Sequence, residues 1–122
     1  EIISASSVTP LIISNKELSL LEEEVKILFP AINFHGVHGA GSAARCKPHP
    51  DPVWKAFENG EMHPHKDRIW FVGDSTYDTD CALATGCVPI LVGAGKSLPE
   101  GYLAQNPAVI HVPSLEVLSL SL

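Results

Sequence analysis

The sequence has few basic residues and no long apolar run. Eight lysines and arginines stand against fourteen aspartates and glutamates, which gives a net charge of −6. A nucleic-acid-binding surface needs clustered Lys and Arg, so this balance argues against nucleic acid as a partner. The longest apolar stretches, such as Val88 to Val92, fall far short of the roughly 20 residues that a membrane-spanning helix needs. Neither nucleic acid nor a membrane is therefore expected as a partner.

The cysteines are also few and show no C-x-x-C pair. The chain has three, Cys46, Cys81 and Cys87, and an odd, unpatterned set suits a reducing cytoplasm better than a disulfide scaffold.

At 122 residues and 45% hydrophobic composition, the chain is long enough for one domain with a buried core. It begins at Glu1 without a signal-peptide pattern, and we expect a processed or truncated product of a larger domain.

Apolar and amphipathic segments alternate along the chain. Strands are expected at residues 7–14, 33–38, 68–72, 88–92 and 109–112, and helices at 16–29, 50–59, 76–84, 98–104 and 114–120. This alternation predicts a three-layer α/β fold with a mainly parallel sheet. Ligands bind beyond the carboxyl ends of the strands in such sheets, so the residues that follow the strands are the candidates for function.

Two of these strand ends carry polar groups of modest specificity. Ser14-x-x-Glu17 fits a capping box for the next helix, and we favour that role, although a hydroxyl at a helix start also binds anions such as phosphate. Lys47 precedes two prolines, Pro48 and Pro50, which hold the backbone in few conformations. A fixed ammonium is useful for neutralising a phosphate, although a surface lysine in a proline-rich loop is the plainer interpretation.

The third strand end is the most informative. Asp74 directly follows the apolar segment Ile69 to Val72, and Asp78 comes four residues later at an expected helix start. Carboxylates that converge there suit Mg²⁺, which binds through one or two carboxylates and keeps several waters. Ser75-x-x-Asp78 also fits a capping box, which accounts for Asp78 better than for Asp74.

Taken in order, L-I-I-S-N-K, K-P-H-P-D and F-V-G-D-S-T-Y-D followed by A-L-A-T-G-C resemble the second, third and fourth motifs of haloacid dehalogenase superfamily phosphatases, closest to the phosphoglycolate-phosphatase-like branch. The resemblance covers nearly the whole chain, residues 1–122, as the C-terminal half of a Rossmann-like core. It implies a small phosphorylated metabolite as substrate and Mg²⁺ as cofactor. It implies that Ser14 and Asn15 bind the phosphoryl group with Lys47, that Lys47 and Asp78 are catalytic, and that Asp74, Asp78 and Ser75 serve the metal.

The chain departs from the family at one decisive point. The first motif, D-x-D-x-T, supplies the aspartate nucleophile in the family, and these 122 residues contain no such motif and no cap domain. We expect the chain alone to be inactive. In the family the nucleophile strand lies between the strands that end here at Ser14 and Asp74. Without that strand a gap is left between its two neighbours, and we expect a separate chain to fill it. The alternatives are that two copies exchange strands into a dimer or that the two neighbouring strands pair directly.

Two other functions stay open from the sequence. The chain would be a non-catalytic binding or oligomerising module if it never joins a nucleophile segment. Alternatively, Gly73-Asp74-Ser75 resembles the nucleophile block of GDS-type esterases, with Ser75 as the attacking group. A late histidine, His111, is available for that chemistry, but no aspartate lies near it in the sequence.

Overall fold

Strands and helices alternate along the chain, as the sequence predicts. The computed structural model describes residues 8–58, 60, 63, 68–93 and 98–120. Its strands are β1 (Leu11–Glu17), β2 (Gly36–Ala40), β3 (Trp70–Gly73), β4 (Val88–Val92) and β5 (Ile110–Val112). Its helices are α2 (Leu18–Leu28), α3 (Asp51–Ala56), α4 (Thr76–Thr85), α5 (Tyr102–Gln105) and α6 (Leu115–Ser119). The α/β class is therefore confirmed.

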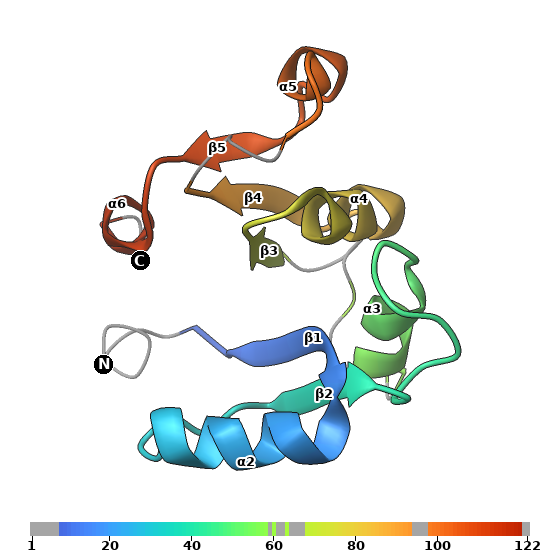
Figure 1. Ribbon diagram of the computed structural model, residues 1–122, viewed down its shortest axis with the longest axis vertical. Coiled ribbons are helices and arrows are strands. Elements are labelled where there is room, and N and C mark those ends of the chain that lie inside the picture. Colours follow the sequence, from blue (N-terminus) through green and yellow to red (C-terminus); the bar gives the residue numbers. More distant parts are fainter. Residues whose placement is uncertain (1–7, 59, 61–62, 64–67, 94–97, 121–122) are drawn as a thin grey trace.

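The strands pair in parallel, but within the described residues they form two sheets. One sheet has the order β1-β2, and the other has the order β3-β4-β5. β1 and β3 are the edge strands that face each other in Figure 1. No backbone ladder joins these two strands in the described part of the chain, so the alternative of direct pairing between them is wrong.

Helices cover the two sheets and connect them. α2 packs against β1 and β2, α4 packs against β3 and β4, and α6 packs against β5. α3 contacts both β2 and α4 and so lies between two halves of the molecule, one built on the β1–β2 sheet and the other on the β3–β4–β5 sheet (Figure 1). None of the helices in the described ranges has the length and apolar character that crossing a membrane takes.

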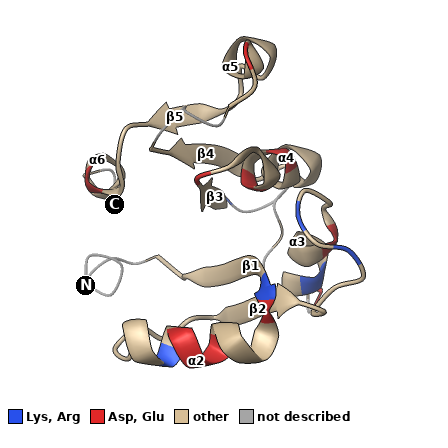
Figure 2. Ribbon diagram, in the orientation of Figure 1, with Lys and Arg blue, Asp and Glu red and all other residues tan. Residues whose placement is uncertain are grey.

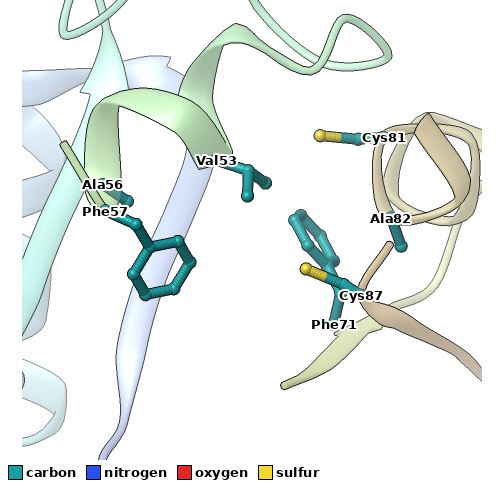
Figure 3. Close-up of a cluster of buried hydrophobic side chains, with 7 residues drawn as sticks. All are labelled: Val53, Ala56, Phe57, Phe71, Cys81, Ala82 and Cys87. Atoms are coloured by element: carbon teal, nitrogen blue, oxygen red, sulfur yellow. The ribbon is translucent and has the colours of Figure 1, made fainter. Parts of the chain in front are cut away.

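One cluster of core side chains lies where the two halves meet. Its buried side chains come from α3 and the residue after it, from β3, and from α4 and the turn beyond it; they are Val53, Ala56, Phe57, Phe71, Cys81, Ala82 and Cys87 (Figure 3). Leu11 and Ile13 of β1 pack against this cluster from the first sheet. The cluster therefore links the sheets through side chains where the backbone leaves them unpaired. On β3, Trp70 and Val72 alternate with buried Phe71 and stay 36% and 39% exposed.

The start of α2 corrects one prediction. Glu17, and not Ser14, is the N-cap: its carboxylate accepts hydrogen bonds from the backbone N–H groups of Ser19 and Leu20. The hydroxyl of Ser19 also donates to Glu17, and this bond above all lowers the pKa of that carboxyl. The expected capping box at Ser14 is wrong because β1 continues through Glu17 and the helix begins later than expected.

A buried hydroxyl network attaches α5 to α4. The phenol oxygen of Tyr102 lies 2.5 Å from Thr79 Oγ1 and donates to Asp80 Oδ1 at 2.6 Å. Burial raises the pKa of the Tyr102 phenol, so the group stays protonated and able to donate at neutral pH. The network holds the C-terminal segment against the helix whose first turn carries Asp78.

Candidate functional site

The ammonium group of Lys47 lies at the centre of the site. Lys47 Nζ donates to the backbone oxygen of Ile13 at 3.0 Å and to Asp78 Oδ1 at 2.5 Å, and it lies 5.8 Å from the centroid of the Phe71 ring. Its side chain is only 11% exposed. An ammonium has three N–H donors. Two are used by Ile13 and Asp78, so the third can serve an anion such as phosphate.

The backbone of Lys47 is fixed as firmly as its side chain. Asn15 Nδ2 donates to the carbonyl of Lys47, and the N–H of Lys47 donates to Asn15 Oδ1, each at 3.0 Å. The peptide bond between Lys47 and Pro48 is cis. Arg45 donates to both carboxylate oxygens of Asp51, at 2.9 and 3.1 Å, and this bond lowers the pKa of Asp51. The loop that presents Lys47 is thus tied to β1 and to α3.

A break in the β1–β2 ladder presents Ser14 and Asn15. Ile13 pairs with His38 and Glu17 pairs with Ala40, so four steps along β1 correspond to two steps along β2. Irregularities of this kind turn side chains out of the regular ladder and are common beside active sites. Ser14 Oγ accepts the N–H of Lys16 at 3.1 Å, which leaves the hydroxyl proton for another acceptor.

Asp78 bonds through both of its carboxylate oxygens. Oδ1 accepts from Lys47, and Oδ2 accepts from the N–H of Asp74 at 3.2 Å and from the N–H and hydroxyl of Ser75 at 3.3 and 3.1 Å. Together with Ser75 it forms the predicted capping box of α4. These contacts hold the Lys47 ammonium in place.

Gly73 makes this arrangement possible, a role that the sequence did not lead us to expect. A Cβ atom built on Gly73 would lie 2.2 Å from the carboxylate of Asp78, which is closer than atoms can approach. Any side chain at position 73 would displace Asp78 from the end of β3. The glycine before Asp74 was the available signal, since glycine in a strand often marks a close approach.

Asp74 has a different environment from Asp78. It is exposed, and its carboxylate makes no hydrogen bond or ion pair with the residues that the structure describes. Its position immediately after β3 places it beside Ser75 and the Asp78 cap. No group of three or more His, Cys, Asp or Glu side chains within 8–58, 60, 63, 68–93 and 98–120 is placed to hold a metal ion. Asp74 is therefore one free carboxylate and not a complete metal cage.

Four of the six residues singled out from the sequence lie close together; they are Ser14, Lys47, Asp74 and Asp78. Lys47 bonds to both neighbours of Ser14, and Asp78 bonds to Lys47 and to the backbone of Asp74. Figure 2 shows basic residues in the segment between β2 and α3, and acidic residues along α2 and on α4. The site thus combines a fixed cation, a free carboxylate and a hydroxyl, which is a set suited to a phosphate and a hard cation.

Comparison with known proteins identifies similar sequences. Residues 2–92 match the family model described as haloacid dehalogenase-like hydrolase. The chain is 28% identical over 109 residues to phosphoglycolate phosphatase from Salmonella choleraesuis (strain SC-B67), and 30% identical over 100 residues to the enzyme of that name from Escherichia coli (strain K12). These matches cover 89% and 82% of this chain but 42% and 39% of the relatives. The chain thus spans about two-fifths of their length.

Solved structures show the same fold. A HAD-superfamily hydrolase from Ehrlichia chaffeensis superposes with a TM-score of 0.76 at 24% identity, over 97% of this chain and 51% of that one. A predicted phosphoglycolate phosphatase from Haemophilus somnus superposes with a TM-score of 0.77 at 22% identity, over 98% of this chain and 52% of that one. At these identities the likeness establishes a shared Rossmann-like architecture.

Proposed function

Because this chain belongs to the haloacid dehalogenase-like hydrolase family, we propose that it forms the phosphate-binding and metal-binding half of a Mg²⁺-dependent phosphatase. The reaction is hydrolysis of a phosphomonoester through an aspartyl-phosphate. One observation carries the proposal: the Lys47 ammonium is nearly buried, is fixed by Ile13 and Asp78, and has one N–H left, while the same Asp78 accepts the backbone N–H of Asp74. Catalysis of phosphoryl transfer rests mainly on such positioned charges.

In this proposal three residues act on the phosphate. Lys47 directs its remaining N–H at a phosphate oxygen and neutralises the charge that the phosphate and the nucleophile bring. Ser14 donates its hydroxyl proton to a second oxygen, while Lys16 holds the hydroxyl oxygen through its N–H. Asp78 keeps Lys47 in place and supports the turn that carries Asp74. Asn15 stays a predicted neighbour of the phosphoryl group.

The residues fit Mg²⁺ through Asp74. Mg²⁺ is bound in proteins by one or two carboxylates together with water and substrate phosphate, so a single free carboxylate is sufficient from this half. Ser75 is adjacent and is proposed to contact the water shell of the metal. Asp78 remains a predicted ligand, but its oxygens already accept four hydrogen bonds, which favours its role on Lys47. Bound there, Mg²⁺ neutralises charge on the phosphate oxygens.

The nucleophile must come from outside these 122 residues, since they contain no D-x-D-x-T motif. We propose that an extended segment carrying it, supplied by a separate chain, lies between β1 and β3. Within the described residues the facing edges of the two sheets do not pair with each other, which supports this, because an edge strand offers backbone N–H and C=O groups for pairing. The chain alone is then a partial core domain without turnover. The free, buried thiols of Cys81 and Cys87 support a cytoplasmic location.

The relatives suggest the substrate class. Both sequence relatives described above carry the name phosphoglycolate phosphatase, so a small phosphorylated acid such as phosphoglycolate is the substrate that we propose to test first. The contacts of Ser75 do not favour an esterase, because its hydroxyl donates to Asp78 within a helix cap.

Binding of inorganic phosphate tests this function without requiring turnover. We expect phosphate, titrated by calorimetry in the presence of Mg²⁺, to bind the 122-residue chain and Lys47→Met to weaken binding at least about tenfold, the effect of one charge-assisted hydrogen bond. Lys55→Met is the matched control, because Lys55 pairs with Glu58 on the surface, at 2.8 Å. Absence of phosphate binding, or an equal loss in both variants, would contradict the proposal.

A further inference from the structure

The side-chain amide of Asn15 hydrogen-bonds to the backbone of Lys47 through both its nitrogen and its oxygen. Its Nδ2 donates to the Lys47 carbonyl, and its Oδ1 accepts the Lys47 N–H, across 32 positions of the sequence. The two bonds close a small ring, in which the side-chain amide of Asn15 pairs with both the N–H and the C=O of Lys47. We infer that Asn15 is a positioning residue that acts on phosphate through Lys47. This inference rests on the proposed phosphate site.

A third contact from the same strand completes the arrangement. Lys47 Nζ donates to the carbonyl of Ile13, two residues before Asn15 on β1. Two residues of strand span about 6.6 Å, at roughly 3.3 Å each. Lys47 is therefore held at its backbone by Asn15 and at its ammonium by Ile13, so its side chain lies along the strand. In this orientation the ammonium lies within hydrogen-bond distance of Asp78 on α4, in the half built on β3, β4 and β5.

Only an amide side chain of this length meets the requirement. The Lys47 peptide groups need one acceptor and one donor at the same place, and Asn supplies both. A carboxylate supplies the acceptor alone, and an alkyl group supplies neither. Asn15 is exposed, so its two bonds contribute to the geometry of Lys47 and not to a buried core.

The experiment compares Asn15→Ala and Asn15→Asp in the 122-residue chain. The first readout is the side-chain ¹⁵N–¹H signal of the Lys47 ammonium, assigned with Lys47→Arg; the second is hydrogen exchange of the Lys47 backbone N–H. The third is the dissociation constant for inorganic phosphate. Asn106→Ala is the matched control, because Asn106 also donates its side-chain amide to a backbone carbonyl, that of Tyr102, at 2.9 Å.

We expect Asn15→Ala to broaden or abolish the ammonium signal, to speed exchange of the Lys47 N–H by at least about tenfold, and to weaken phosphate binding about tenfold. Asn15→Asp should retain slow exchange of the N–H, since it keeps the acceptor, and should still weaken phosphate binding. Asn106→Ala should change none of the three. Unchanged ammonium signal and exchange in Asn15→Ala would overturn the inference. Loss of both, in a chain that binds no phosphate, would uphold the positioning role and reject the proposed function.

Discussion

The ammonium of Lys47 and the carboxylate of Asp78 lie 2.5 Å apart although different halves of the molecule hold them. Lys47 is fixed to β1 through Asn15 and Ile13, whereas Asp78 belongs to α4, which packs on β3 and β4. Both side chains are about nine-tenths buried. The ion pair is thus a polar link between two sheets that share no backbone ladder in the described residues.

Breaking this pair should destabilise the fold. Asp78→Asn keeps a capping oxygen for α4 but leaves the ammonium nearly buried without its counter-charge, which costs about 3 kcal/mol. Glu58→Gln, which breaks the exposed Lys55–Glu58 pair, should change the free energy of unfolding by less than about 1 kcal/mol. Urea unfolding at neutral pH measures both. Adding Lys47→Met to Asp78→Asn should recover part of the loss, and equal costs for the two single changes would contradict the assignment.

Gly73→Ala should act through Asp78. The added methyl would meet the Asp78 carboxylate at 2.2 Å, and we expect a loss of about 2 kcal/mol as Asp78 is pushed away from Lys47. In an Asp78→Gly background, which removes the carboxylate and also the Cβ that lies 2.3 Å from the added methyl, the same change should cost clearly less. A double-mutant cycle by urea unfolding gives the coupling. Additive costs would show that the glycine serves another purpose.

The buried thiol of Cys81 should make stability depend on alkaline pH. Burial raises the pKa of Cys81 from 9.0 to about 11. The unfolded chain therefore releases this proton at lower pH than the folded chain, so the contribution of Cys81 is fully present below about pH 9 and is lost as pH rises toward about 11. Between about pH 8 and about pH 10.5, native chain should lose more stability than Cys81→Ala. Identical losses in urea midpoint would refute this.

The 122-residue chain should not hydrolyse phosphate esters at enzyme-like rates. Its charges are positioned, but the covalent nucleophile of the family is not among its residues. A metal-dependent assay with p-nitrophenyl phosphate tests this on purified protein. Hydrolysis that requires Mg²⁺ and disappears in Asp74→Asn would mean that the nucleophile lies within this chain after all.

The chain should also be found with a partner. β1 and β3 do not pair with each other in the described residues, and an edge strand offers backbone N–H and C=O groups to another chain, so we expect a second polypeptide or a second copy to pair with them. Denaturing mass spectrometry distinguishes the two, and light scattering gives the assembly size. A lone 13.1 kDa species that is monomeric and cooperatively folded would contradict the proposed segment between the sheets.

Local patterns predicted much of this structure. β4 runs from Val88 to Val92 as the apolar run indicates, and α4 begins with the Ser75–Asp78 capping box and ends at Gly86, whose φ of 82° suits glycine. These features depend on residues within one or two turns of each other. The positions of Lys47, Asp74 and Asp78 after successive predicted strands also indicated that they belong to one site, and the structure places them together.

Features that depend on distant backbone could not be predicted in this way. The clamp of Asn15 on Lys47 spans 32 positions and arises from the break in the β1–β2 register, which no local pattern marks. Beyond the same break β1 continues to Glu17, so the N-cap of α2 is Glu17 and not Ser14. The contact of Gly73 with Asp78 likewise depends on how α4 lies against β3.

Trp70 gives this protein an optical reporter in a useful place. It opens β3, the edge strand that faces β1, and keeps 36% of its surface exposed. Indole emission shifts with the polarity of its surroundings, so a segment that pairs with β3 would alter the fluorescence of Trp70. The other tryptophan, Trp54 on α3, stacks on His63 with ring centroids 5.6 Å apart, and a Trp54→Phe variant would leave Trp70 as the single emitter. Association at the open edge can therefore be followed in the unlabelled protein.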